Sequence, residues 1–245
     1  MLAAIKSEFR KLLTVRTTYF MILMAFLLTS GLIAFWIFGY QDVSKADTNA
    51  NALLESVYNA VSIMGIFVSL ITIMLVGHEY RYNTIMYSLT SVNRRSKLFF
   101  AKYLVSIVFS LIVAAILASL TIVAFNIGQS VHHINTTSQH LPVLQMIWHC
   151  AASIAANVTF SFILAIIIRS LIGAIVTILI VPSTIEGLLS ILLKENVKYL
   201  PFTALSNLTS VSTKVSATMS LSLVAAYAAF FGLVSYILFL KRDAN

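Results

Sequence analysis

The chain has 245 residues, of which 60% are hydrophobic and 10% charged, and its formal net charge is +8. This composition excludes a separate soluble domain, because no connection between the apolar stretches is long enough to fold alone. The basic residues are spread along the chain, which excludes a compact nucleic-acid-binding surface and instead fits the anionic headgroups of a lipid bilayer.

Residues 1–16 predict a short amphipathic helix that lies on the membrane surface. Leu2, Ile5, Phe9 and Leu12 recur at helical spacing, and polar residues occupy the opposite side. The apolar stretch that follows is longer than the hydrophobic core of a signal peptide. We therefore expect it to be retained as the first membrane span.

Six stretches have the length that a helix needs to cross about 30 Å of hydrocarbon. The fifth reaches this length only by continuing past Glu186, and it contains Pro182, which is expected to kink it. Only Arg169 and Ser170 separate the fourth and fifth stretches, so these two helices should be antiparallel neighbours. The sequence thus predicts an all-α, polytopic membrane protein with a single domain over residues 1–245 and spans at 17–41, 56–77, 103–131, 141–168, 170–193 and 215–240.

Two connections carry more than turn residues. Between spans two and three, Tyr82, Ile85, Met86 and Leu89 recur at helical spacing and predict a second amphipathic helix. Between spans five and six, residues 194–214 mix polar side chains with an apolar cluster, which is typical of a re-entrant or interfacial segment.

The basic residues also predict an orientation. Twelve of the 16 Lys and Arg residues lie at the ends and connections of one side of the predicted membrane domain. Because cytoplasmic connections carry the excess of basic residues, both termini of this multi-pass protein are expected in the cytoplasm, with the spans in the plasma membrane.

Charged motifs beside the first three spans resemble those of permease subunits of type-2 ATP-binding-cassette exporters. They are Glu8-Phe9-Arg10-Lys11, Glu79-Tyr80-Arg81-Tyr82-Asn83-Thr84 and the segment 93–102. The six-span plan with cytoplasmic ends is similar as well, so the likeness covers essentially the whole chain. Departures are Asn83 and Ser91-Val92-Asn93, where family members often carry Gly and Pro; the amphipathic helix is therefore expected to have different ends here.

The resemblance implies a homodimer, or a heterodimer with a related permease, that exports a hydrophobic or amphipathic peptide, drug or lipid-like substrate. It also implies that ATP-binding subunits dock on the surface helix and on the helix between spans two and three, which acts as a coupling helix. The segment between spans five and six would form outer half-helices. The implied docking residues are Ile5, Glu8, Phe9, Arg10, Glu79, Arg81, Tyr82, Ile85, Met86 and Leu89.

The chain has no Gly-x-x-x-x-Gly-Lys-Ser/Thr loop that would hold the phosphates of a nucleotide. We therefore expect this subunit to be no enzyme and to bind no cofactor, while ATP and Mg²⁺ are bound by the partner. Glu79, beside Arg81, is either a charged latch between span two and the coupling helix or an ordinary ion pair at the membrane interface.

Three polar residues inside apolar stretches are candidates for a substrate path: Asn126, Asn157 and Glu186. Glu186 either faces the path or reaches water at the outer interface, and a proton-coupled secondary carrier that uses Glu186 is the alternative function. An intramembrane enzyme is a weaker alternative, because no catalytic motif is present. The histidines at 132, 133, 140 and 149 fit no metal-ligand spacing, so no metal site is expected.

Overall fold

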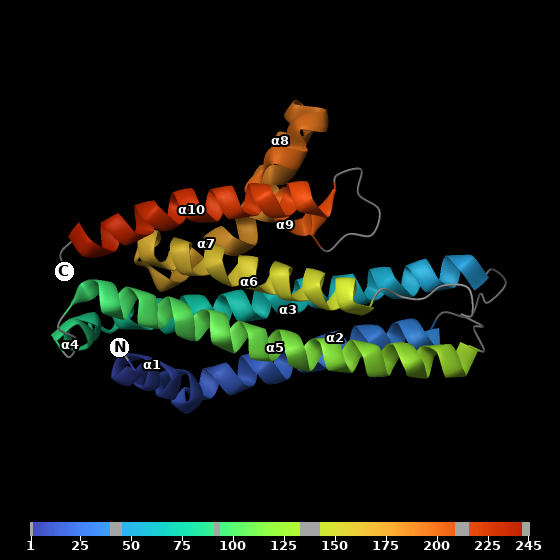
Figure 1. Ribbon diagram of the computed structural model, residues 1–245, viewed down its shortest axis with the longest axis horizontal. Helices are drawn as coiled ribbons and strands as arrows, with labels where there is room; N and C mark the ends of the chain where they lie inside the picture. The colour runs from blue at the N-terminus through green and yellow to red at the C-terminus, as the bar shows by residue number, and fades with distance from the viewer. Residues whose placement is uncertain (1, 40–45, 91–93, 133–142, 209–215, 242–245) are drawn as a thin grey trace.

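The computed structural model describes residues 2–39, 46–90, 94–132, 143–208 and 216–241. Within these ranges every regular element is a helix. The long helices lie side by side along the length of the molecule, and one short helical segment points away from them (Figure 1). The predicted all-helical class is confirmed.

The chain begins with the amphipathic helix α1 (Leu2–Thr14), followed by α2 (Arg16–Gly39). The direction of the chain changes by 65° between them. The buried positions of α1 are Ala4, Glu8 and Leu12, which are spaced four residues apart and form one stripe against the bundle. Glu8 therefore faces inward although it is charged.

Helix α3 (Ala46–Arg81) and helix α5 (Arg95–His132) both begin well before the predicted starts of their spans at residues 56 and 103. Polar residues thus extend both helices beyond the apolar stretches. The short helix α4 (Ile85–Thr90) lies between them, and it begins later than the predicted helix because residues 82–84 form a turn. Asn83 has φ = 52° in this turn, a left-handed conformation that Asn tolerates better than most residues.

Helix α6 (Val143–Ile168) and helix α7 (Leu171–Ile180) are joined by the two residues that the sequence indicated. The hydroxyl of Ser170 accepts the backbone N–H of Gly173 at 3.3 Å and caps α7. A π-helical turn, η1 (Val181–Ile185), contains Pro182, which has no N–H to donate. Beyond this turn, α8 (Glu186–Leu193) points away from the other helices (Figure 1), as expected for a kink at Pro182.

The described part of the predicted re-entrant segment consists of a 3₁₀ helix, η2 (Lys194–Tyr199), and α9 (Pro201–Asn207). They lead the chain back to α6 and to the last helix, α10 (Ala217–Lys241). Leu205 of α9 packs in one cluster with Phe160 of α6 and Val224 of α10. The Tyr227 hydroxyl of α10 also donates to the Tyr199 carbonyl at 2.9 Å.

Five helical segments within the described residues are long and apolar enough to cross a membrane, and the bent pair α1–α2 brings the number to six if it counts as one span. These segments make the chain a multi-pass membrane protein. By length and composition Leu171–Leu193 is one of the five, although only its α7 part runs along the bundle (Figure 1).

Candidate functional site

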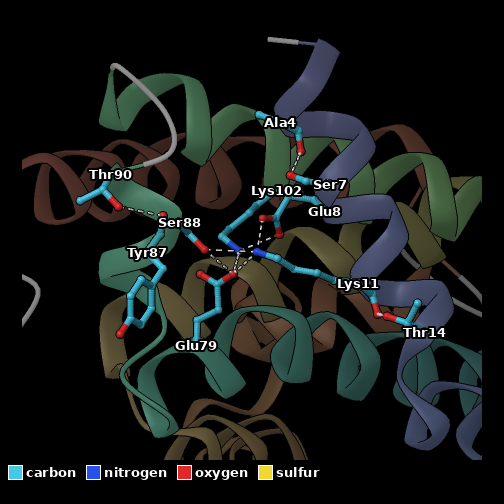
Figure 2. A network of polar contacts seen from close by, with 10 residues as sticks. All are labelled: Ala4, Ser7, Glu8, Lys11, Thr14, Glu79, Tyr87, Ser88, Thr90 and Lys102. Atoms are coloured by element: carbon cyan, nitrogen blue, oxygen red, sulfur yellow. Dashed lines mark hydrogen bonds and ion pairs between the residues drawn. The ribbon is translucent and has the colours of Figure 1, made fainter.

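A cluster of four charged side chains joins α1, α3 and α5 at the end of the bundle that carries α4 (Figure 2). The ammonium group of Lys102 donates to Glu8 Oε2 at 2.7 Å and lies 2.8 Å from Glu79 Oε1. The ammonium group of Lys11 donates to Glu8 Oε1 at 2.6 Å and to Glu79 Oε1 at 2.5 Å. We call Glu8, Lys11, Glu79 and Lys102 the charge cluster.

The fold places these groups together because each belongs to the inward stripe of its helix or to the edge of that stripe. Lys102 follows Leu98 by one turn and precedes Val105 and Phe109, which are all buried. Helix α5 begins before Lys102, so this lysine lies within the helix and is carried into the packed interior. Glu8 faces it from the inward stripe of α1.

The cluster brings two carboxylates together with two ammonium groups, so its charges balance. Lys102 and Glu8 are each 1% exposed, and burying either charge alone would be costly. Lys11 is partly exposed. Burial lowers the pKa of Lys11, but its hydrogen bonds and charge attraction to Glu79 and Glu8 outweigh this and raise that pKa above 10.5. Lys11 is therefore charged at neutral pH.

Helix α4 joins the cluster through one hydroxyl. Ser88 Oγ donates to Glu79 Oε1 at 3.1 Å and accepts from the Lys11 ammonium group at 3.2 Å. Figure 2 shows Ser88 and Tyr87 on α4 beside the carboxylate of Glu79. The cluster thus links four elements of the chain at one point.

An open cleft of about 400 Å³ lies beside the cluster, between α1, α2, α3 and α4. Its polar side includes Lys11, His78, Glu79 and Ser88, while Leu12, Ile71 and Leu75 belong to its apolar side. Tyr82 and Tyr87 also line it and are largely exposed.

The predicted docking residues separate into buried and exposed groups. Glu8, Glu79 and Ile85 are buried, and their side chains cannot reach a partner in this conformation. Ile5, Phe9 and Leu89 are partly buried and pack against the two large apolar clusters of the bundle. The remaining predicted residues, which are exposed, are Arg10, Arg81, Tyr82 and Met86.

Two details of this surface differ from the sequence interpretation. Glu79 does not form an exposed ion pair with Arg81; it is buried and paired with the two lysines, while the Arg81 guanidinium lies 5.6 Å from the centre of the Tyr82 ring. Tyr87 is 77% exposed, the largest exposure among the apolar and aromatic side chains of α4, and the spacing argument missed it.

Glu186 caps helix α9. Its Oε1 accepts the backbone N–H of Phe202 at 2.9 Å, and its Oε2 accepts the backbone N–H and the hydroxyl of Thr203 at 2.6 and 2.7 Å. The first N–H groups of a helix have no partner within the helix, and a side-chain oxygen commonly satisfies them. Glu186 is 5% exposed and joins the start of α8 to the start of α9. Neither reading of Glu186 from the sequence included this contact.

The other two candidates for a substrate path, Asn157 and Asn126, belong to different helices from Glu186. Asn157 is half-buried in α6 and lines a cavity between α3, α6, α7 and α9. Asn126 belongs to α5, but its side chain lies outside the described part of the chain, as do residues 133 and 140 with their histidines.

Sequence reasoning also missed Lys102 as a functional candidate. A signal was present: Lys102 follows Leu98 by four residues and precedes Val105 and Phe109 by three and seven, which is the spacing of a buried helical stripe. The start of the apolar stretch at Tyr103 concealed this spacing, because the helix was expected to begin there.

A model of a protein family of unknown function, DUF2705, matches residues 12–244. No curated protein matches the chain. Since the family match covers nearly the full length and includes Glu79, Lys102 and Glu186, the protein belongs to the DUF2705 family.

Proposed function

We propose that this chain is the membrane-spanning subunit of an ATP-driven exporter for a hydrophobic or amphipathic substrate. It pairs with a second copy or a related permease, and two ATP-binding subunits dock on the end of the bundle that carries α4, which faces the cytoplasm. The chain itself holds neither ATP nor Mg²⁺. This assignment agrees with the likeness to type-2 ATP-binding-cassette permeases in the sequence.

The charge cluster is the observation that carries the proposal. Movement of a docked subunit reaches the spans only if the docking helices are firmly attached to them. Ser88 of α4 and the two α1 residues Glu8 and Lys11 bind the buried groups Glu79 and Lys102, which belong to spans. Of the cluster's buried side-chain atoms, Glu79 Oε2 lacks a hydrogen-bond partner among the described residues, and the groups that are paired favour one arrangement of the four elements. The cluster therefore supports transmission from α1 and α4 to α3 and α5.

The exposed side chains at the same end supply the docking surface. Tyr82, Met86 and Tyr87 are 63%, 49% and 77% exposed. Aromatic residues, Met and Arg are enriched in protein interfaces, and Arg81 lies beside Tyr82. We define Arg81, Tyr82, Met86 and Tyr87 as the docking surface.

The proton-coupled carrier receives no support from the contacts of Glu186. All three hydrogen bonds of its carboxylate go to the first turn of α9. This use positions two short helices and calls for no proton exchange. We therefore retain the ATP-driven exporter as the proposed function.

The test is co-purification. We expect the affinity-tagged chain, expressed at its native level, to purify with a subunit that carries a nucleotide-binding loop and hydrolyses ATP. Replacing Met86 and Tyr87 with Asp should reduce the yield of that subunit about tenfold or more, because each change places a charge in the centre of the interface. Lys241→Asp, exposed on α10, is the control. An undiminished yield in the double variant, or no ATP-hydrolysing subunit, would contradict the proposal.

A further inference from the structure

A second cavity, of about 240 Å³, lies between α3, α6, α7 with η1, and α9. Half of its lining residues are polar, and the other half are apolar side chains such as Ile66, Leu179 and Leu205. All of its lining residues are described, and none is ionisable. The polar ones are Ser62, Ser69, Ser153, Asn157, Ser183 and Ser206.

The cavity lies at bilayer depth. Ser69 is separated from Glu79 by ten residues of α3, which corresponds to about 15 Å along the helix. The apolar part of α3 is Val61–Arg81, so Ser69 is near its middle. Polar groups at this depth need partners, because the surrounding hydrocarbon supplies none.

Ser69 lacks such a partner. Its side chain is fully buried, and among the described residues nothing forms a hydrogen bond with its hydroxyl. Other serine hydroxyls near the cavity donate to a carbonyl of their own helix, as Ser161 does to Asn157 at 2.7 Å and Ser183 does to Leu179 at 3.0 Å. The Ser69 hydroxyl oxygen is itself covered, so a group bound in the cavity that Ser69 lines would have to enter between the covering side chains to become its partner.

Asn157 supplies a second contact across the cavity. Its Nδ2 donates to the Ser153 carbonyl at 3.0 Å, which leaves the amide oxygen for an incoming donor. Gly65 on α3 permits this arrangement, because a Cβ atom there would lie only 3.1 Å from Asn157 Nδ2. A ligand held between Ser69 and Asn157 would receive a hydrogen bond from the hydroxyl and give one to the amide.

The apolar residues at the opening of the cavity indicate that the ligand also has an apolar part. Ile66 and Leu179 line the cavity and are 42% and 43% exposed, so they border its opening toward lipid. The cavity of about 240 Å³ is smaller than the ~300–1,000 Å³ typical of pockets for small-molecule ligands. This is room for a small headgroup with several hydroxyls and too little for a drug-sized molecule.

We propose that this cavity binds the uncharged, hydroxyl-bearing headgroup of a single-chain amphipath, with Ser69 and Asn157 as its hydrogen-bonding groups and the tail directed past Ile66 and Leu179. A charged headgroup is disfavoured because no ionisable side chain lines the cavity. The role of such a molecule as an exported substrate rests on the proposed function, but its binding does not.

The probe is a monoacylglycerol that carries a diazirine in its headgroup, cross-linked to the purified full chain in lipid nanodiscs. We expect saturable labelling of segments 62–69 and 153–157 that excess unlabelled monoacylglycerol competes away. Ser69→Ala and Asn157→Leu should each raise the half-saturating concentration about three- to tenfold, the usual effect of losing one hydrogen bond. Ser110→Ala, which removes an equally buried serine hydroxyl on α5, should leave it unchanged.

A purely structural role for Ser69 predicts a different pattern. Because its hydroxyl has no partner, Ser69→Ala should unfold at the same temperature as the wild type or higher, so weaker labelling without lost stability identifies a binding role. Gly65→Ala removes no polar group but crowds Asn157, because a Cβ atom there would lie 3.1 Å from Asn157 Nδ2, and it should also weaken labelling.

Several results would overturn the proposal. They are the absence of saturable labelling, labelling unaffected by Ser69→Ala and Asn157→Leu, and equal labelling by the matching fatty acid and alkylamine. Co-purification of the ATP-binding subunit, measured on the same variants, separates the two proposals. Retained co-purification without labelling contradicts only the binding site, whereas labelling without any such subunit contradicts only the exporter.

Discussion

At the scale of single residues, the charge cluster is stable only because its charges are balanced. Lys102 and Glu8 are both 1% exposed, and removing either one leaves the cluster with an uncompensated buried charge. Removing one member of a buried ion pair is far more costly than replacing both, since the remaining charge has lost its partner. The single variant should therefore lose more stability than the double variant.

Lys102→Met keeps the approximate size of the side chain and leaves two carboxylates with one ammonium group. We expect it to lower the free energy of unfolding by ~3–5 kcal/mol, measured by thermal unfolding in detergent. The double variant Glu8→Gln with Lys102→Met restores the balance and should regain part of this loss. Lys97→Met, at an exposed position of the same helix, should change stability by only ~0.5 kcal/mol or less. A Lys102→Met variant as stable as the wild type would show that the cluster does not hold α1 to the bundle.

The carboxylate of Glu186 gives a second test at this scale. Glu186→Gln presents an amide NH₂ to backbone donors, so at least one of the hydrogen bonds to Phe202 and Thr203 is lost. We expect a loss of ~1–3 kcal/mol in stability, together with greater protease accessibility of α9. The matched change Glu186→Asp keeps the charge but shortens the side chain. Its stability should lie between that of the wild type and that of Glu186→Gln. Wild-type stability and accessibility in Glu186→Gln would rule out the capping role.

At the scale of elements, α3 and α7 approach each other closely at Gly77. A Cβ atom at Gly77 would lie 2.8 Å from Leu171 Cδ1 and 3.1 Å from Leu171 Cα. The second distance involves the backbone, so a rotamer change alone cannot relieve the clash. Leu171 itself packs in the cluster that includes Ile73 and Phe162.

Gly77→Ala should therefore separate α3 from α7 and destabilise the protein by ~1–3 kcal/mol, the usual cost of overpacking. Gly31→Ala is the control, because a Cβ atom there meets nothing within 4 Å. That change should be neutral or stabilising by up to ~1 kcal/mol, since Ala favours helix over Gly. Equal melting temperatures for the two variants would contradict close packing of α3 on α7.

At the scale of the whole molecule, the first and last helices meet the start of α5 at the same end of the bundle. Glu8 of α1 binds Lys102 of α5, and the Arg95 guanidinium donates to the Leu240 carbonyl of α10 at 3.1 Å. This end also carries α4 (Figure 1). Helix α9 lies away from the end that carries α4 and packs against α6 and α10. Residues of α9 and of the α4 end can therefore be used to test the orientation of the chain in the membrane.

In a Cys150→Ala background, we expect Ser206→Cys to react with a membrane-impermeant maleimide on intact cells. Lys97→Cys should react only after the membrane is opened, because the excess of basic residues assigns its side to the cytoplasm. Both positions have intermediate or greater exposure, so access through the protein does not limit either reaction. The reverse pattern would place the termini outside.

Much of the fold could be predicted because each span is recognisable from its own local sequence. Long apolar stretches separated by charged or turn residues specify where helices run, whatever they pack against. The ends of α1 and the two-residue connection of α6 to α7 followed from this local pattern. The starts of α3 and α5 could not be predicted in this way, because polar residues that extend a helix do not raise the local hydropathy.

The sequence by itself determined that the chain is helical and membrane-embedded, that amphipathic helices flank the spans, and that Glu186 is an acidic residue at an unusual position. Only the tertiary structure decided which residues meet. The partners of Glu186 are 16 and 17 residues away, and Glu8, one of the two partners of Lys102, is 94 residues away; local periodicity carries no information about such pairs. Buried charges and hydroxyls depend on those distant partners, which is why Lys102, Ser69 and the cap of α9 emerged only from the packed chain.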